Sequence, residues 1–592
     1  MSREKEYSIL YLVWRVCVQY IKTSKWQGVL EQLVTIIHAL SYTAIIAATR
    51  VLFDTITQAS QGTMDFWEVA TPLAILVALT IGQQIISAAE SFISLELSAK
   101  NFCRYMEQFQ RKIGRLQAEH FEDTDFLNDV FRAKNFIDEE ELGDFMSLCF
   151  RIVTFFSVFF ISVSVYLFSL TPILLLVIVA AFIPALLGQL AQIKIFDELE
   201  EENAPLRRQN EYYQEAIASR KNFKETRLLG GFRFFNRLFT ETLYDLTQNT
   251  WKTERKVALL RTLLNIAAFA GFGVSIFMLF NATMAGDISV GAFAAVFAAL
   301  TQIFSLMEEI VSSELSSGSE YIGQLNNYYK IMDMDEVGGK EGDADYSKGI
   351  IAYKISFTYP DREEKAVNKV SLTIKEGETI AIVGENGAGK STLVRLLTGL
   401  YQPSGGTVKV GGLDTKKIHP NSVYKGISGV FQRYQRYKMS LKDNVYISDT
   451  KSEPNKEAIE QALFQAEFNE KTATLDTMLS PEFDGIDLSG GQWQRLAIAR
   501  GLYRTSKFIV LDEPTAAIDP IEEERIFNQF KDLSKDKCAI LVTHRLGSAK
   551  LADRIIVMSD GKISDIGTHD ELVLRKGLYA NMWKAQAAWY SR

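Results

Sequence analysis

The sequence predicts an α-helical membrane domain followed by an α/β domain that contains a phosphate-binding loop. Three observations support this fold class: long stretches without Lys or Arg early in the chain, short β-rich runs alternating with helical ones late in the chain, and a glycine-rich loop that ends in a lysine. A chain of 592 residues is too long for one ordinary core and needs two or more domains. We expect the membrane domain at residues 1–336 and the α/β domain at residues 337–592.

Three stretches of the first domain contain no Lys or Arg, namely residues 51–99, 152–193 and 262–329. A membrane-spanning helix needs about 20 apolar residues, so the second and third stretches each have room for two spans. The sequence therefore predicts six spans, at about residues 28–52, 67–93, 147–169, 171–193, 258–280 and 288–312. The first span is less clean than the others, because it contains Glu31, His38 and Arg50.

The basic residues lie between the predicted pairs of spans and not at their tips. The positive-inside rule then places both termini and the long connections 100–144 and 194–256 in the cytosol. These connections are polar with few Gly or Pro, and we expect them to be helices that continue the spans. Each connection must turn back, and its turn, around 120–127 or 210–217, could touch a cytosolic domain.

The first 25 residues do not resemble a signal peptide, because Arg15 interrupts the apolar stretch 9–20 and no cleavage site follows. An amphipathic helix on the inner membrane surface fits them better. In that helix Arg15, Lys22 and Lys25 are expected near lipid headgroups.

Charge and cysteine content do not point to nucleic-acid binding or to a metal site. A formal net charge of −8 gives no electrostatic reason to expect nucleic acid as a partner. The cysteines Cys17, Cys103, Cys149 and Cys538 form no C-x-x-C pair and no metal-ligand cluster.

The α/β domain follows a Gly- and Asp-rich linker at residues 333–349. Its β-rich runs are residues 349–357, 370–374, 379–383, 508–511, 538–542 and 554–558. They alternate with helical segments, as expected of an α/β fold.

A phosphate-binding loop of the form G-x-x-x-x-G-K-[ST] follows the third of these runs. It consists of Gly384, Glu385, Asn386, Gly387, Ala388, Gly389, Lys390, Ser391 and Thr392. The glycines let backbone N–H groups turn towards phosphate oxygens, and the N-terminus of the following helix adds positive potential. We expect Lys390 to contact the β- and γ-phosphates of ATP, and the Ser391 hydroxyl to bind Mg²⁺.

A second motif is the apolar run 508–511 followed by Asp512 and Glu513. A buried strand that ends in Asp suits a Mg²⁺ ligand, and the next carboxylate suits a base for an attacking water. Taken alone, the pattern is more typical of a core strand that ends in a polar turn. Other motifs in the same domain decide between a catalytic and a purely structural role for Asp512 and Glu513.

The most specific of these motifs is the segment Leu488-Ser489-Gly490-Gly491-Gln492, which begins 24 residues before Asp512. With it, the chain resembles the ATP-binding cassette (ABC) transporters, whose signature sequence is LSGGQ. The other family motifs occur in family order: Tyr359 for the aromatic that stacks on adenine, Gln432 for the Q-loop, Asp519 for the D-loop and His544 for the switch histidine. The D-loop departs from the usual S-A-L-D, since it reads Ala516-Ala517-Ile518-Asp519. A packed core aromatic remains the alternative for Tyr359.

The resemblance covers the whole chain and implies an exporter-type half-transporter. It implies that Glu513 acts as the base, that Lys390 and His544 stabilise charge, and that Mg²⁺ is held through Ser391, Gln432 and Asp512. One phosphate loop and one LSGGQ cannot complete a site in a single chain, so a dimer is implied. In it Ser489, Gly490, Gly491 and Gln492 of one chain face the nucleotide held by Lys390 of the other. The motifs are intact, which favours a homodimer over an asymmetric heterodimer.

Residues 431–440 and 488–494 also look like the cassettes of bacterial exporters of ribosomally made peptides, such as lanthipeptides. Many such exporters carry an N-terminal cysteine protease domain, and there is no room for one before the first span. The expected function is therefore ATP-driven export of a cationic peptide across the cell membrane, without leader cleavage. The alternatives are a multidrug exporter or lipid flippase, an importer, and a membrane-anchored sensor or regulatory ATPase.

The charge of the first domain supports a cationic substrate. The stretches 51–99 and 262–329 together contain ten acidic residues and no Lys or Arg. Four of these acids, Glu90, Glu96, Glu308 and Glu309, are expected at the cytosolic mouth of the pathway. A ring of carboxylates there would concentrate cations. The alternative is that they are solvated faces of helices that leave the membrane.

Overall fold

A computed structural model describes residues 7–62, 65–170, 172–219, 222–310, 315–360, 362–432, 434–469, 473–513 and 537–590. The chain forms two compact units. The first unit comprises residues 1–111 and 129–333, and the second comprises residues 112–128 and 334–592. The segment 112–128 lies in the first predicted cytosolic connection and includes its expected turn around 120–127, and it packs with the second unit, as expected of that turn.

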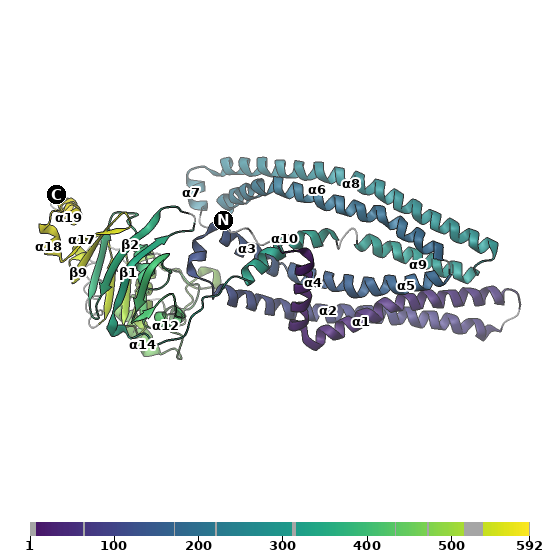
Figure 1. The fold of residues 1–592 in the computed structure, drawn as a ribbon, viewed down its shortest axis with the longest axis horizontal. Coiled ribbons are helices and arrows are strands. Elements are labelled where there is room, and N and C mark those ends of the chain that lie inside the picture. Colours follow the sequence, from purple (N-terminus) through teal and green to yellow (C-terminus); the bar gives the residue numbers. More distant parts are fainter. Residues whose placement is uncertain are drawn as a thin grey trace. The chain divides into compact units, whose positions relative to one another are not determined.

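Long helices make up the first unit (Figure 1). Their bounds are α1 Ile9–Ala59, α2 Phe66–Ile113, α3 Thr124–Asp138, α4 Glu141–Phe150, α5 Ser157–Leu170, α6 Pro172–Ala218, α7 Phe223–Leu228, α8 Phe232–Ala285, α9 Val290–Glu309 and α10 Leu315–Met332. A π-helical segment, Arg151–Phe156, joins α4 to α5. Helix α6 lies beside α8, and α1 lies beside α9. The 48 residues of α2 extend about 72 Å, more than twice the roughly 30 Å of a hydrocarbon core.

Four described helical stretches are long and apolar enough to cross a membrane: Ile9–Ala59, Phe66–Ile113, Glu141–Ser169 and Phe232–Ala285. They contain the first, second, third and fifth predicted spans. The fourth predicted span coincides with the start of α6, apart from residue 171, which lies outside the described residues. The sixth overlaps α9, whose apolar part Val290–Leu306 is shorter, and its last residues, 311 and 312, are also outside the described part.

The surface of α2 is apolar along most of the predicted span. Ile75, Ile81, Ile85, Phe92 and Leu95 are each more than half exposed. A continuous apolar face of this kind is rare on a water-exposed surface and is typical of a lipid or protein interface.

The N-terminal part of α1 differs from the expectation at Arg15. Instead of reaching lipid headgroups, the Arg15 guanidinium donates hydrogen bonds of 2.5 Å to both carboxylate oxygens of Asp333. It also lies 4.0 Å from the centre of the Tyr329 ring, and the Tyr7 hydroxyl donates to the same carboxylate at 2.7 Å. The planar guanidinium and the carboxylate meet as a fork, which makes this charge-assisted pair strong. Lys25 interrupts the helix with φ 51° and ψ −132°.

The second unit is an α/β domain with two sheets, as predicted. The antiparallel sheet has the order β2-β1-β4-β5, formed by β1 Ile350–Thr358, β2 Lys365–Ile374, β4 Gly405–Val410 and β5 Leu413–Asp414. The other sheet has the order β10-β9-β3-β8-β7-β6 and is parallel except for β10. Its strands are β3 Thr379–Gly384, β6 Ile427–Val430, β7 Phe508–Asp512, β8 Cys538–Val542, β9 Arg554–Ser559 and β10 Lys562–Gly567.

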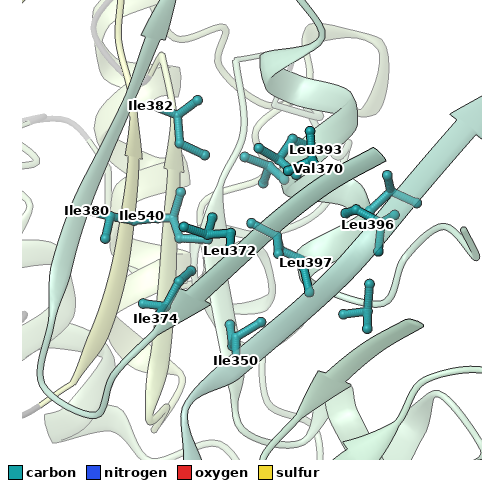
Figure 2. Packing of buried hydrophobic residues seen from close by; sticks show 14 of the residues in the cluster. Ile350, Val370, Leu372, Ile374, Ile380, Ile382, Leu393, Leu396, Leu397 and Ile540 are labelled. Carbon is teal, nitrogen blue, oxygen red and sulfur yellow. The ribbon is translucent and has the colours of Figure 1, made fainter. Parts of the chain in front are cut away.

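The helices of this unit are α11 Lys390–Leu397, α12 Asn421–Tyr424, α13 Leu441–Tyr446, α14 Lys456–Gln465, α15 Gly490–Tyr503, α17 Leu546–Ala549, α18 His569–Leu574 and α19 Leu578–Tyr590. Helix α11 packs against both sheets (Figure 2). Its Leu393, Leu396 and Leu397 are fully buried with Ile374 of the antiparallel sheet and Ile540 of the parallel sheet. This core fixes the start of α11, where the phosphate-binding loop ends.

A separate core holds the LSGGQ segment. Leu441 of α13, Ile459 of α14 and Trp493 of α15 are buried together with Leu488, the first residue of the signature. The signature and the phosphate-binding loop therefore belong to two different hydrophobic clusters of the same unit.

Shortening Leu393 tests the importance of the core around α11. We expect Leu393→Ala to lower the free energy of unfolding of the second unit by about 2–5 kcal/mol, because it leaves a cavity in a closed core. Thermal unfolding of the purified chain would measure the change. Phe464→Ala is the matched control, since this α14 side chain is 83% exposed and its removal should cost little. Equal effects of the two changes would contradict the prediction.

Candidate active site

The phosphate-binding loop joins β3 to α11 through strained glycines. Gly384, Gly387 and Gly389 have φ angles of 154°, 83° and 92°. A Cβ at Gly384 would lie 2.3 Å from the carbonyl oxygen of Met558, and one at Gly389 would lie 2.2 Å from that of Ala366. Both positions therefore require glycine for space as well as for conformation. Glu385, Asn386 and Gly387 are exposed at the tip of the loop, and Ala388 is buried in the core.

Lys390 is the first residue of α11 and is almost fully buried, at 6% exposure. Its ammonium donates to the carbonyl oxygens of Gly384 at 3.1 Å and Glu385 at 2.9 Å. Burial lowers the pKa of Lys390, against the opposing charges of Glu513 and Asp512. An ammonium has three N–H donors, so the two bonds to the loop leave one for a phosphate oxygen.

Ser391 and Asp512 form an oxygen-donor pair beside the lysine. The Ser391 hydroxyl lies 3.4 Å from Oδ1 of Asp512, which is 8% exposed at the end of β7. Burial raises the pKa of Asp512, as does the neighbouring charge of Glu513. A hydroxyl and a carboxylate are ligands that Mg²⁺ accepts together with phosphate and water oxygens. No group of three His, Cys, Asp or Glu side chains in the described residues could hold a metal without such outside ligands.

The Glu513 carboxylate is held from both sides. Its Oε2 accepts a hydrogen bond of 2.7 Å from Nε2 of Gln432, and its Oε1 lies 2.5 Å from Nε2 of His544. Its backbone has φ 48°, and its N–H donates to the carbonyl oxygen of Val542 at 3.0 Å. Gln432, Glu513 and His544 each follow the end of one of three neighbouring parallel strands, which explains their convergence.

The surroundings of His544 favour its neutral imidazole. Burial and the charge of Lys390 lower the pKa of His544 below its ordinary value, and this outweighs the opposing effect of Glu513. A neutral imidazole can still donate one hydrogen bond. His544 is therefore suited to orienting a carboxylate and contacting a phosphate, without adding a full positive charge.

Tyr359 lies beside the phosphate-binding loop. It follows β1 and is half-buried, and its ring stands edge-on to Phe357 at 5.1 Å. Its hydroxyl lies 3.0 Å from Oγ1 of Thr392, at the C-terminal end of the loop motif. A flat ring at this place can stack on the base of a nucleotide whose phosphates occupy the loop.

The LSGGQ segment begins helix α15. The Ser489 side chain accepts a hydrogen bond from the backbone of Gln492, whose side chain reaches back to the backbone of Ser489. This capping box leaves Ser489 and Gly490 exposed. A Cβ at Gly490 or Gly491 would have no atom within 4 Å. The chain itself therefore does not require glycine at these two positions.

The structure thus gathers most of the predicted residues around the phosphate-binding loop, and the signature residues lie on another core. Asp519 and the rest of the predicted D-loop are outside the described residues. Sequence reasoning missed Arg395, which donates to the Tyr359 hydroxyl at 3.2 Å and to Glu122 at 3.1 Å. No local pattern could have identified it, because Glu122 is 273 residues away in the sequence.

Comparison with known families assigns both parts of the chain. Residues 32–307 match the family model of the ABC transporter transmembrane region, and residues 367–516 match that of the ABC transporter. The solved structure of a bacterial Atm1-family ABC exporter with ATP bound has the same fold. It aligns with 96% of this chain and 99% of its own, with a TM-score of 0.72 and 19% identity.

Similar curated proteins include two transport ATP-binding proteins and a flippase. The subtilin transport ATP-binding protein SpaT of Bacillus subtilis is 34% identical over 61% of this chain and 60% of its own length. The nisin transport ATP-binding protein NisT of Lactococcus lactis subsp. lactis is 25% identical over 85% of each chain. The ATP-dependent lipid A-core flippase of Photobacterium profundum is 30% identical over 62% of this chain and 63% of its own length.

The matches to the subtilin transport protein and to the flippase cover less than two thirds of those proteins' own lengths. The two family models, by contrast, account for most of this chain and agree with its motifs. The chain therefore belongs to the ABC transporter family, with a transmembrane region and an ATP-binding domain in one polypeptide.

Proposed function

We propose that this chain is an ATP-hydrolysing exporter that works as a homodimer in the cell membrane. The observation that carries the proposal is the Glu513 carboxylate, fixed between Gln432 and His544 directly after Asp512. A carboxylate restrained on both sides, next to a phosphate-binding loop, is suited to orienting and deprotonating a water molecule.

In the proposed mechanism, the loop and Lys390 bind the phosphates of ATP, and Tyr359 stacks on adenine. Glu513 accepts a proton from the water that attacks the γ-phosphate in line, and His544 holds that carboxylate in position. Bound through Ser391, Gln432 and Asp512, Mg²⁺ would neutralise charge on the phosphate oxygens. Gln432 can serve both roles, because its amide nitrogen donates to Glu513 and its amide oxygen is a suitable cation ligand.

The membrane arrangement proposed is six spans with both termini and the cassette in the cytosol. Among the described residues, four helical stretches are long and apolar enough to cross a membrane, and we assign the other two spans to α6 and α9. The distribution of Lys and Arg between the spans supports this orientation. We propose that the membrane domain ends at residue 336 and the cassette begins at residue 337. The compact units of the chain divide nearby, between Asp333 and Met334.

The signature segment supports the proposed dimer. Gly490 and Gly491 have open space around them, and the N-terminal end of α15 is exposed. The free N–H groups of a helix N-terminus attract phosphate. In the proposed dimer, this end approaches the nucleotide bound to Lys390 of the second copy, which explains why glycine occupies positions that the chain itself leaves open.

The substrate class proposed is a cationic, ribosomally made peptide. The subtilin and nisin transport relatives support a peptide, whereas the lipid A-core flippases favour a lipid as the second candidate. Two of the four acids expected at the cytosolic mouth have partners in the structure. Glu90 is engaged by His38 at 2.5 Å and Thr35 at 2.8 Å, and Glu96 pairs with Lys100. The side chains of Glu308 and Glu309 lie outside the described part of the structure.

Replacing the proposed base tests the mechanism. Glu513→Gln should retain ATP binding and lose about 10²–10⁴-fold in turnover, because it keeps the shape of the side chain and removes its basicity. ATP hydrolysis and ATP binding by the purified chain in nanodiscs would measure both. Asp476→Asn, at a carboxylate whose exposed side chain pairs with Lys442, is the control. Near-normal turnover of Glu513→Gln would refute the assignment.

Mixing two inactive variants tests the shared site. Lys390→Ala disables the phosphate loop, and Gly491→Asp places a negative charge at the signature without a clash inside its own chain. Each homodimer should fail to hydrolyse ATP. A purified mixed dimer should recover single-turnover hydrolysis, because one of its two sites combines an intact loop with an intact signature. An inactive mixed dimer, or an active monomer, would contradict the homodimer model.

Neutralising the remaining acids tests the substrate. The double change Glu308→Gln and Glu309→Gln should weaken stimulation of ATP hydrolysis by a cationic peptide. The effect should be largest at low salt, where charges are least screened. Glu107→Gln is the control, since this exposed acid pairs with Arg111 on the same helix. Unchanged apparent affinity for the peptide, or stimulation by neutral lipids alone, would exclude charge attraction at this mouth.

A further inference from the structure

The side chain of Gln586 holds the backbone on both sides of Arg545. Gln586 lies on α19, and its Nε2 donates a hydrogen bond of 2.5 Å to the carbonyl oxygen of His544. Its Oε1 accepts a hydrogen bond of 2.9 Å from the backbone N–H of Leu546. Between these two groups Arg545 is extended, with φ −97° and ψ 109°. In extended backbone, the carbonyl before a residue and the N–H after it point to the same side, so one side-chain amide can bind both.

The same amide provides a partner for the beginning of α17. Leu546 is the first residue of that helix and is fully buried, and the preceding residue, Arg545, provides no side-chain cap. The first N–H groups of a helix have no partner within the helix, and a buried one without an acceptor is unfavourable. Gln586 supplies the acceptor from a position 40 residues away in the sequence. The backbone that carries His544 is thus attached to α19 at two points.

Helix α19 is itself fixed to the core of the ATP-binding domain. Tyr579 lies seven residues before Gln586, on the same face of the helix. It is 1% exposed and belongs to one buried cluster with Leu546 and with Val383 of β3. Its hydroxyl lies 2.7 Å from Nδ1 of His569, at the start of α18. Gln586 therefore extends from a well-anchored helix.

The imidazole of His544 is only partly enclosed by the protein. Its side chain is 39% exposed, and its Nε2 lies 2.5 Å from Oε1 of Glu513. The direction of so exposed a side chain depends strongly on its backbone and on the hydrogen bonds that hold that backbone. A series of contacts thus runs from α19 through Gln586 and His544 to the proposed base.

We propose that Gln586 is a positioning residue for ATP hydrolysis, which fixes the backbone of His544 so that the imidazole holds Glu513 ready to accept a proton from water. This inference rests on the proposed roles of His544 and Glu513. A purely structural role explains the contact less well, because α19 is already anchored by Tyr579 and Ala580, each 1% exposed. A catalytic group displaced by about 1 Å can lower a rate about 100-fold, so a small shift of this backbone would matter.

Two variants of Gln586 test this role in the full chain in nanodiscs. Gln586→Ala removes both hydrogen bonds, whereas Gln586→Glu keeps the acceptor for Leu546 and removes the donor for the His544 carbonyl. Both should lower kcat for ATP hydrolysis about ten-fold or more. KM for ATP and the Tm should change little, because the phosphate-binding loop and the domain core are untouched. Asn581→Ala, at an exposed amide of the same helix, is the matched control and should leave kcat unchanged.

A double variant shows whether Gln586 acts through His544. Gln586→Ala combined with His544→Ala should hydrolyse ATP no more slowly than His544→Ala alone, because both changes affect the same contact with Glu513. Independent, multiplying effects would place the action of Gln586 elsewhere and would overturn the proposal. So would a loss of ATP affinity as large as the loss in kcat, because the whole site would then be disturbed.

His544→Ala separates this inference from the proposed function on which it rests. If His544→Ala keeps near-normal turnover, the proposed role of His544 is wrong and the inference fails with it. If His544→Ala loses turnover while both Gln586 variants keep it, the role of His544 stands and the positioning role of Gln586 is refuted. Should Gln586→Ala fail to fold, Gln586→Glu still decides, because it has the same size and retains the bond to Leu546.

Discussion

The carboxyl ends of neighbouring parallel strands meet at one edge of the larger sheet, and the proposed chemistry depends on that edge. The strands β3, β8, β7 and β6 are consecutive in the sheet. The phosphate-binding loop, His544, Glu513 and Gln432 each follow one of these ends. A sheet edge of this kind brings together residues that are far apart in sequence, as with Gln432 and Glu513, which are 81 positions apart.

Burial gives the site its electrostatic character. Lys390 and Asp512 are nearly inaccessible to solvent, and burial moves both of their pKa values towards the neutral form. Their mutual attraction opposes this change. A phosphate bound beside Lys390, or a cation bound beside Asp512, would stabilise the charged form of that side chain. Because a buried charge without a partner is unfavourable, the site should bind such ligands strongly.

Local motifs explain why so much of the ATP-binding domain was predictable from sequence. The loop from Gly384 to Thr392 needs glycines at fixed spacing, and the LSGGQ signature occupies five consecutive residues. The long helices of the membrane domain were equally visible as stretches without Lys or Arg. One long-range contact was expected, that of the turn around 120–127 with the cytosolic domain, and residues 112–128 do pack with it. The side-chain partners in such contacts were not predictable, because hydrophobic periodicity says nothing about them. The pairing of Arg15 with Asp333 is the clearest case, since the same arginine looked suitable for lipid headgroups.

The ATP-binding unit is built from two separate stretches of the chain, and this affects work on its isolated form. A recombinant domain that starts at Met334 would lack Glu119 and Glu122. The backbone N–H of Gln402 and the Tyr401 hydroxyl would then bond to water, and Arg395 would lose its carboxylate. Nucleotide constants measured on such a fragment would describe a domain whose α11 surface lacks these contacts. A tether that supplies residues 112–128 would restore the missing partners.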